Sequence, residues 1–352
     1  MKTRVVVAMS GGVDSSAAAA LLKEQGHEVI GITLRVWSYE GAAKCGSCCS
    51  PDDIDDARAV AEALGIPFYV ANVEELFKAE VVQPFVREYV SGRTPIPCVA
   101  CNQRVKFDFL LQRARSLGAR LATGHYARIS ETAGGHFSLE RARDRQKDQS
   151  YFLFTLGQGE LRDIVFPVGD LAKAEVREVA RRHRLPTSAK PESMEICFVP
   201  DGDYAGFVER AAGPQPAGEI VDGEGKVLGG HRGVHHFTVG QRRGLGVASD
   251  QALYVQRLEA DARRVVVGTA HQAERSTFTV LRPHWVSARP PEPDRALEVK
   301  IRHRHAGAAA RVARASSEKL EVELLAPARA IAPGQAAVFY EGDRVLGGGW
   351  IA

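Results

Sequence analysis

A short glycine-containing turn near the amino terminus constrains the fold more than any other segment. Ser10 to Ser16 (SGGVDSS) lies between an apolar run at 2–9 and an alanine-rich stretch at 14–25. The apolar run predicts a strand, and the stretch after the turn predicts a helix. A strand that enters a helix through such a turn begins a βαβ unit, which predicts a parallel sheet covered by helices.

The same turn has the composition of a phosphate-binding loop. Gly11 and Gly12 let backbone N–H groups approach an anion, and the start of the following helix adds a positive dipole end. No Gly-Lys-Ser/Thr follows, so this is not a Walker A loop whose lysine reaches the β and γ phosphates. The loop therefore favours cleavage between the α and β phosphates. An isolated two-glycine turn is often only a connection, but its place after the first strand favours a binding site.

The chain has 352 residues, enough for two or three domains that each bury a core. Strand and helix patterns alternate up to about residue 200, and short strands separated by glycine turns follow. We predict an α/β fold with a Rossmann-like domain built around this turn, a small, mostly β middle domain, and a C-terminal β-barrel. The expected boundaries are 1–200, 201–275 and 276–352.

Composition excludes several classes of protein. Hydrophobic residues make up 45% and charged residues 25%, which excludes wholesale disorder. No run of about 18 apolar residues exists, so no membrane partner is expected. Met1 to Arg4 leads directly into valines without a signal-peptide pattern, so we expect a cytoplasmic protein. We also expect a monomer.

Further motifs resemble one enzyme family. Residues 10–15 are similar to the PP-loop of ATP pyrophosphatases, and motifs spread from residue 8 to 349 resemble the tRNA-specific 2-thiouridylases. These motifs are Gly92 to Pro95, Cys101-Asn102, Ala122 to Tyr126, Lys147 to Leu153, Ile196 to Phe198, Thr238 to Arg242, Pro333 to Gln335 and Leu346 to Gly349. The resemblance implies that ATP activates the C2 oxygen of the wobble uridine (position 34) in lysine, glutamate and glutamine tRNAs. Sulfur would then displace AMP.

The resemblance also implies a PP-loop ATP-binding domain at 1–200, a middle domain at 201–275 that contacts tRNA, and a set of binding residues. Adenine and ribose should lie across the sheet ends from the loop. The expected ATP contacts are Ala8, Met9, Ser10, Gly11, Gly12, Val13, Asp14, Ser15, Leu34 and Gly124. We expect Asp14 to help position Mg²⁺ on the departing pyrophosphate. The expected tRNA contacts are His125, Lys147, Asp148, Gln149, Arg302, His303 and Gln335, with Ile96, Pro97 and Cys98 beside the flipped target base.

Two cysteines suit sulfur transfer. A persulfide on one thiol can attack an activated carbon, and a second thiol can then release the sulfur and leave a disulfide. By resemblance, Cys197 carries the persulfide and Cys101 is the nucleophile. The sulfur would come from a donor protein or from sulfide. Either cysteine alone would more often be a buried structural thiol.

Cys98 leaves a second route open. Cys98 and Cys101 form a C-x-x-C, and Cys197 adds a third thiolate. Three thiolates can hold a [4Fe–4S] cluster with one open iron, which could deliver hydrosulfide in place of the persulfide. The sequence favours the thiol route slightly.

A second cysteine cluster, Cys45, Cys48 and Cys49, lies in a glycine-rich loop. A four-thiolate zinc site would need another C-x-x-C, and borrowing Cys101 would remove the catalytic thiol. We therefore expect a mobile loop near the active site, with metal binding as the alternative.

The positive charge lies in the C-terminal domain. Residues 276–352 contain 11 Lys and Arg against 8 Asp and Glu, an excess that equals the formal +3 of the whole chain. Residues 300–314 contain five basic residues and no acid, and 141–149 form another basic loop. Both segments predict contact with RNA phosphates, although a solvated strand edge has a similar composition.

Two other functions stay open. A PP-loop synthetase acting on a small metabolite would need neither the cysteines nor the basic domain. A tRNA-binding protein that has lost its chemistry would not need the intact SGGVDS loop.

Overall fold

The computed structural model describes residues 3–37, 51–132, 134–191, 196–199, 201–292 and 295–352. Cys45, Cys48 and Cys49 lie outside the described residues, so the role expected for their loop stays a prediction. Within the described ranges, no helix is both long and apolar enough to cross a membrane.

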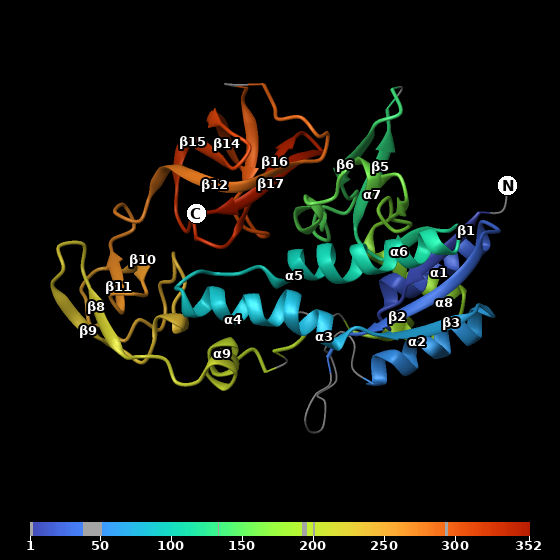
Figure 1. Cartoon of the computed structure of the whole chain (residues 1–352), viewed down its shortest axis with the longest axis horizontal. Coiled ribbons are helices and arrows are strands. Elements are labelled where there is room, and N and C mark those ends of the chain that lie inside the picture. The colour runs from blue at the N-terminus through green and yellow to red at the C-terminus, as the bar shows by residue number, and fades with distance from the viewer. Residues whose placement is uncertain (1–2, 38–50, 133, 192–195, 200, 293–294) are drawn as a thin grey trace.

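The amino-terminal part contains a five-stranded parallel sheet in the order β3-β2-β1-β4-β7 (Figure 1). This confirms the predicted α/β class. The strands are β1 (Arg4–Ala8), β2 (Glu28–Arg35), β3 (Phe68–Asn72), β4 (Arg120–Thr123) and β7 (Ile164–Val165).

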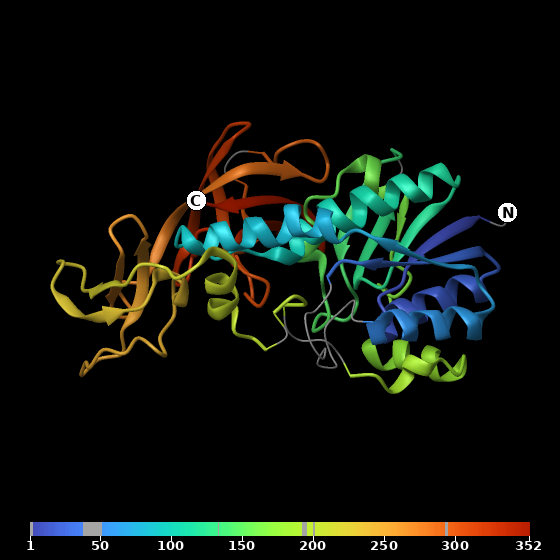
Figure 2. The same cartoon turned by 60° about the horizontal axis from the view of Figure 1, so that its bottom comes forward.

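Helices cover both faces of this sheet (Figure 2). Val5 and Val7 of β1 pack in one apolar cluster with α1, α2 and α8, whereas Val6 packs in another with α6. This alternation is the period of two of a strand buried on both faces, as parallel strands usually are. The helices are α1 (Val13–Glu24), α2 (Pro51–Leu64), α6 (Asp108–Ser116) and α8 (Lys173–Arg182).

A long helical segment leads from the sheet toward the rest of the chain. It includes two π-helical stretches, η1 and η2, and the second runs directly into α6. Helix α6 thus continues a π-helix that begins at Cys101. Its parts are α3 (Glu74–Phe77), η1 (Lys78–Val82), α4 (Gln83–Val90), α5 (Pro97–Ala100) and η2 (Cys101–Phe107).

The middle part is small and mostly β, as predicted. Helix α9 (Tyr204–Ala212) precedes it, and its four strands pair in the order β10-β11-β8-β9. Strands β8 and β9 form an antiparallel hairpin around Asp222. The remaining elements are β8 (Gly218–Val221), β9 (Val227–His231), the 3-10 turn η5 (Val234–His236), β10 (Tyr254–Glu259) and β11 (Arg264–Gly268).

The carboxyl-terminal part is a closed β-barrel, which confirms that prediction. Six strands follow the order β12-β15-β14-β13-β16-β17, and β12 also pairs with β17 to close the ring. The strands are β12 (Arg275–Trp285), β13 (Leu297–Lys300), β14 (Ala308–Ala315), β15 (Lys319–Ala328), β16 (Ala336–Glu341) and β17 (Arg344–Ile351).

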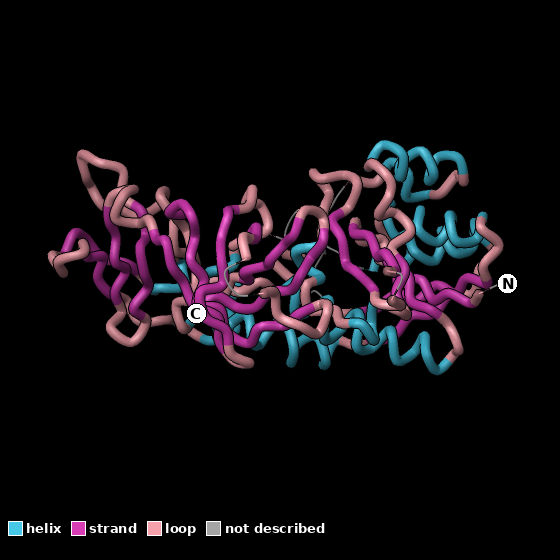
Figure 3. Tube along the Cα trace, turned by 90° about the horizontal axis from the view of Figure 1, so that it is seen from above, coloured by secondary structure: helices cyan, strands magenta, loops and turns pink. Residues whose placement is uncertain are grey.

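One hairpin joins the barrel to the amino-terminal part. The strands β5 (Ala127–Glu131) and β6 (Phe137–Arg141) follow β4 in sequence, yet β6 pairs with β17 through Leu139 and Val345. Two short elements follow β6 in the same region, η3 (Ser150–Leu153) and α7 (Gln158–Leu161), whereas the later η4 (Pro186–Ala189) packs against α1, α2 and α8. Seen from above, strands run along the length of the molecule, and helices lie both near the amino terminus and farther along it (Figure 3). This hairpin therefore fixes the barrel over the parallel-sheet part.

Candidate active site

The glycine turn lies at the carboxyl edge of the parallel sheet, between β1 and α1. Gly11 has φ +68°, and a Cβ atom there would lie 2.2 Å from the carbonyl oxygen of Asp53. Only glycine fits this position without displacing α2. Gly12 is the N-cap residue of α1, and no side chain caps the helix. The N–H groups of the first turn therefore suit an anionic ligand.

Serine hydroxyls stabilise the shape of this loop. The Ser15 hydroxyl accepts a hydrogen bond from the Ser10 amide at 3.1 Å and lies 3.2 Å from the Ser10 hydroxyl. The Ser16 hydroxyl donates to the carbonyl of Gly12 at 2.8 Å. Ser10 is exposed whereas Ser15 and Ser16 are buried, so Ser10 is the hydroxyl that can reach a ligand.

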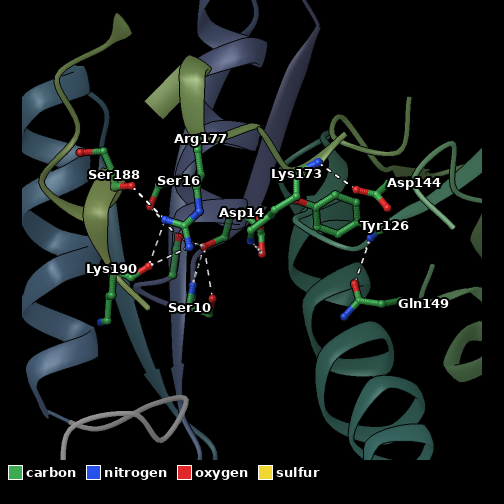
Figure 4. A network of polar contacts seen from close by, with 12 residues as sticks. Ser10, Asp14, Ser16, Tyr126, Asp144, Gln149, Lys173, Arg177, Ser188 and Lys190 are labelled. Carbon is green, nitrogen blue, oxygen red and sulfur yellow. Dashed lines mark hydrogen bonds and ion pairs between the residues drawn. The ribbon is translucent and has the colours of Figure 1, made fainter. Parts of the chain in front are cut away.

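Asp14 is the centre of a charged contact among three elements (Figure 4). Its carboxylate accepts hydrogen bonds from the Tyr126 hydroxyl at 2.7 Å and from Lys173 Nζ at 2.6 and 2.9 Å. A magnesium ion on Asp14 would have to share the carboxylate with Lys173 or displace it. Sequence reasoning missed Lys173, which lies in the first turn of α8 beyond any recognised motif.

Gly124 lies directly against the start of α1. A Cβ atom there would lie 2.6 Å from the Ser15 amide nitrogen, so glycine is required for this approach. Met9 donates to the carbonyl of Ile32 at 2.9 Å, which brings the end of β2 with Leu34 beside the loop. The structure thus brings together the predicted nucleotide contacts on β1, β2 and β4.

His125 follows Gly124 and is uncharged near neutral pH. Burial, helped by the nearby Lys106, lowers the pKa of His125 to about 3. Its Nδ1 lies 2.8 Å from the Thr123 hydroxyl, and its ring packs near Phe107 and Phe166. A neutral, internally bonded imidazole can contact RNA as a hydrogen-bonding group but not as a cation.

A second polar contact supports the loop from the other side. Arg177 donates to the carbonyls of Ser188 and Lys190 at 3.1 and 3.2 Å (Figure 4). Lys190 Nζ pairs with Asp53 at 2.6 Å and with Asp56. Burial alone would lower the pKa of Lys190, but these hydrogen bonds raise it. The ion pairs of Lys190 with Asp53 and Asp56 hold α2 in place, and with it the Asp53 carbonyl that faces Gly11.

The two predicted sulfur-carrying thiols pack against one apolar core. Cys101 begins η2 and Cys197 precedes Phe198, and both are half-buried on the cluster that also contains Leu34. Phe198 lies in an aromatic group with Phe77 and Phe85 at ring distances of 5.6 and 5.1 Å. Both thiols therefore lie on the core that continues to the end of β2.

Cys98 and its neighbours are more open. Cys98 is exposed on α5, and Ile96 and Pro97 before it are half-buried. Asn102, in contrast, is buried and donates to the Phe152 carbonyl at 3.4 Å. Helix α5 thus presents Cys98 to solvent, whereas Asn102 of η2 is held inside.

The barrel contacts the loop just before α5. The Thr94 amide donates to the Pro333 carbonyl at 2.8 Å, and the Gln335 side chain donates to the Thr94 carbonyl at 3.0 Å. A Cβ atom on Gly334 would lie 2.9 Å from the same carbonyl. Gln335, predicted to contact tRNA, therefore also positions the chain that leads to Cys98.

Several other predicted tRNA residues form internal contacts. The buried Asp148 carboxylate accepts hydrogen bonds from the Ala142 amide and from the amide and hydroxyl of Ser150. His303 Nε2 lies 3.2 Å from the Asp148 carbonyl, and its ring lies 4.4 Å from that of Phe152. Gln149 Oε1 accepts from the Tyr126 amide at 3.0 Å. Their contact with tRNA stays a prediction.

Lys147 donates its amide to the Asp144 carbonyl at 3.1 Å. The basic loop around it is largely ion-paired, which its sequence did not indicate. Arg141 pairs with Glu298 at 2.5 Å, Arg143 with Glu175 at 3.1 Å, and Arg145 with Asp343. This loop therefore links the barrel, the hairpin and α8 as well as carrying charge.

The basic barrel segment divides into paired and unpaired residues. Arg311 pairs with Glu323 at 2.8 Å and Arg314 with Glu321 at 3.8 Å across β14 and β15. Arg302 and Arg304 are exposed and have no carboxylate within 4 Å among the described residues. These two arginines are the strongest candidates for phosphate contacts on the barrel.

Three family models match the chain in order. A tRNA methyl transferase HUP domain matches residues 3–201, a tRNA methyl transferase PRC-barrel domain 205–269, and an aminomethyltransferase beta-barrel domain 275–351. The tRNA-specific 2-thiouridylase MnmA of Geobacter metallireducens is 53% identical over 359 residues, which cover 99% of this chain and 97% of that protein. The chain belongs to the tRNA-specific 2-thiouridylase family.

A second relative has the same name. The MnmA of Acidobacterium capsulatum is 49% identical over 367 residues, covering 99% of this chain and 98% of that protein. A solved 4-thiouridine synthetase, in complex with RNA and ATP, is 16% identical with a TM-score of 0.35 and covers 59% of this chain and 50% of its own. The family membership confirms the resemblance carried by the motifs from residue 8 to 349.

Proposed function

We propose that this chain catalyses the ATP-dependent 2-thiolation of the wobble uridine, position 34, in lysine, glutamate and glutamine tRNAs. It acts as a cytoplasmic monomer. The observation that supports the proposal is one apolar core shared by the end of β2 and the half-buried thiols Cys101 and Cys197. The end of β2 lies beside the start of α1, which has no side-chain cap among the described residues. An anion site of this kind suits pyrophosphate, and the thiols suit sulfur transfer.

The first step is adenylation of the base. The C2 oxygen of uracil attacks the α phosphorus of ATP, and the bond to the β-phosphate oxygen breaks. Pyrophosphate leaves on the Gly11–Gly12 loop, where Lys173 and the start of α1 offer positive charge. Mg²⁺ on the departing pyrophosphate would share Asp14 with Lys173.

The second step replaces oxygen with sulfur. A donor protein loads Cys197 with a persulfide, whose terminal sulfur attacks C2 and expels AMP together with the former C2 oxygen. The Cys101 thiolate then attacks Cys197 Sγ, which releases the 2-thiouridine and leaves a Cys101–Cys197 disulfide. An external dithiol must supply two electrons to restore both thiols.

Cys98 supports an alternative source of the sulfur. Cys98 is exposed and lies one helical turn before Cys101, and Cys101 shares its core with Cys197. These three thiolates fit the ligand set of a [4Fe–4S] cluster, which would supply an open iron to bind hydrosulfide.

The decisive experiment uses full-length protein purified without oxygen. Iron and acid-labile sulfide are measured, and AMP and 2-thiouridine are quantified with tRNA, ATP and a sulfur source. We expect Cys101→Ser to abolish 2-thiouridine while tRNA-dependent ATP–pyrophosphate exchange persists. About four irons per chain, together with loss of sulfide-dependent activity in Cys98→Ser, would assign the cluster route.

Other outcomes distinguish the remaining functions. Exchange stimulated by a small metabolite without tRNA would replace the proposal with a synthetase. Binding of tRNA without any AMP would identify a protein that has lost the chemistry.

A further inference from the structure

A cluster of metal-binding side chains lies outside the candidate active site. Glu209 comes from α9, and His235 and His236 come from the turn η5 of the middle part. Glu209 Oε1 lies 3.2 Å from His235 Nε2 and 3.1 Å from His236 Nε2. The three ligand atoms all lie within 4.8 Å of one another, and no other such group occurs in the described part of the chain.

These atoms have the chemistry and spacing of a zinc site. Imidazole nitrogen and carboxylate oxygen are common zinc ligands with bonds of about 2.0 Å, so ligands at two corners of a tetrahedron lie about 3.3 Å apart. The distances from Glu209 Oε1 to the two imidazoles, 3.2 and 3.1 Å, are close to that spacing. Two hydrogen bonds to one carboxylate oxygen would have the same lengths, so an experiment must separate the two states.

The surrounding chain holds the imidazoles toward Glu209. His235 is fully buried, and a Cβ atom on Gly233 would lie 2.5 Å from its Nδ1. That nitrogen has no hydrogen-bond partner among the described residues, and Nε2 is the ring atom of His235 that faces Glu209.

The Glu209 side is open to solvent. Its side chain is 41% exposed, and that of His236 is 28% exposed. A water molecule can therefore complete a tetrahedral set on this side. We propose that Glu209, His235 and His236 bind one zinc ion, with water as the fourth ligand.

The ion would stabilise the junction between the middle part and the long helix. Helix α9 and turn η5 both contact α4. Tyr204 of α9 stacks on Tyr89 of α4 with ring centres 4.9 Å apart, and its hydroxyl donates to the His236 carbonyl at 3.4 Å. One ion joining Glu209 to the two histidines would therefore fix the middle sheet on α4. This inference does not depend on the proposed reaction.

The test is metal binding by the tag-free full chain. Chelator-treated protein is titrated with Co²⁺ and then Zn²⁺, and bound metal is counted while the visible spectrum is recorded. A Co²⁺ site of nitrogen and oxygen ligands gives weak visible bands without the strong near-ultraviolet thiolate absorption that cysteine-bound cobalt shows. We expect these bands, and their loss with about one equivalent of bound metal in Glu209→Gln.

Two variants separate binding from folding. His236→Asn removes a half-exposed ligand, and His271→Gln changes an exposed histidine outside the cluster. We expect His236→Asn to lose the same equivalent and the metal-dependent rise in Tm, whereas His271→Gln keeps both. Equal metal content and spectra in the wild type, Glu209→Gln and His236→Asn would overturn the site and leave two hydrogen bonds.

Discussion

Lys173 Nζ lies 2.6 and 2.9 Å from the two carboxylate oxygens of Asp14 and thereby joins the first turn of α8 to the first turn of α1 (Figure 4). The Lys173 side chain is 13% exposed and that of Asp14 32% exposed. The pair therefore lies partly out of water, beside the loop that we propose holds pyrophosphate. Lys173 offers that site the positive charge that a Walker lysine supplies in other loops.

Replacing Lys173 should impair adenylation. Lys173→Met keeps the length of the side chain but removes the charge that faces Asp14. We expect tRNA-dependent AMP formation to fall by about 10²-fold, similar to the loss of one transition-state donor elsewhere. The matched control is Lys23→Met, on the exposed last turn of α1. Equal rates for the two variants, with both folded, would remove Lys173 from the reaction.

Gly11→Ala should damage the loop beyond its backbone cost. The new Cβ atom would lie 2.2 Å from the Asp53 carbonyl, in addition to the strain of φ +68°. Gly26 has a similar φ of +84° and open space around it, so Gly26→Ala measures the backbone cost alone, about 1 kcal/mol. We expect Gly11→Ala to lower the free energy of unfolding by at least about 1 kcal/mol more and to weaken ATP binding. Denaturant unfolding measures the free energy, and nucleotide titration measures ATP binding. Equal losses of unfolding free energy in Gly11→Ala and Gly26→Ala would show that α2 moves away from the new Cβ atom at no cost.

The unpaired barrel arginines should contribute more to tRNA affinity than the paired ones. Arg302→Gln removes an exposed charge, whereas Arg311→Gln removes one that Glu323 already pairs at 2.8 Å. We expect Arg302→Gln to weaken binding several-fold and to lower the salt slope by about 1, because one phosphate contact is lost. Arg311→Gln should change the slope less. Filter binding at several salt concentrations measures the salt slope of tRNA affinity. Identical slopes for Arg302→Gln and the wild type would exclude a phosphate contact by Arg302.

His125 should make stability depend on pH. Its pKa is about 3 in the folded protein against 6.5 ordinarily, so the unfolded chain binds the extra proton between these values. Stability is therefore complete above about pH 6.5 and falls as the pH drops, with a slope of up to about 1.4 kcal/mol per unit.

His125→Gln tests this relationship. Glutamine can keep a hydrogen bond to Thr123 and does not titrate. We expect a flatter dependence of the unfolding free energy on pH between 4 and 6.5 than in the wild type. Parallel curves for the two proteins would show that other groups cause the dependence.

Local sequence predicted the amino-terminal sheet because its signals are short-range. The valines of β1, the SGGVDSS turn and the alanines of α1 specify strand, turn and helix within about twenty residues. The family motifs were equally visible, and the comparisons confirm what they implied about family. The barrel prediction also holds, although the glycine-rich sequence of β17 has no local strand pattern.

Strand β17 shows why some elements escaped prediction. Its sequence RVLGGGWI contains three glycines, which normally disfavour a strand. In the barrel, a Cβ atom on Gly347 would lie 2.1 Å from the His284 carbonyl, and one on Gly348 would lie 2.5 Å from the Ala337 carbonyl. The glycines allow close backbone approach to β16, the preceding strand, and to β12, which lies far earlier in the chain, and a local pattern does not reveal these contacts.

The sequence by itself determined the α/β class, the anion-binding turn, the cysteines and the family of this protein. The tertiary structure decided which charges are already paired and which parts touch: Lys173 on Asp14, Gln335 on Thr94, and β6 beside β17. The physical reason is range. Strand and helix signals act between near neighbours, whereas these contacts join residues 159 to 241 positions apart, and only the packed chain brings them together.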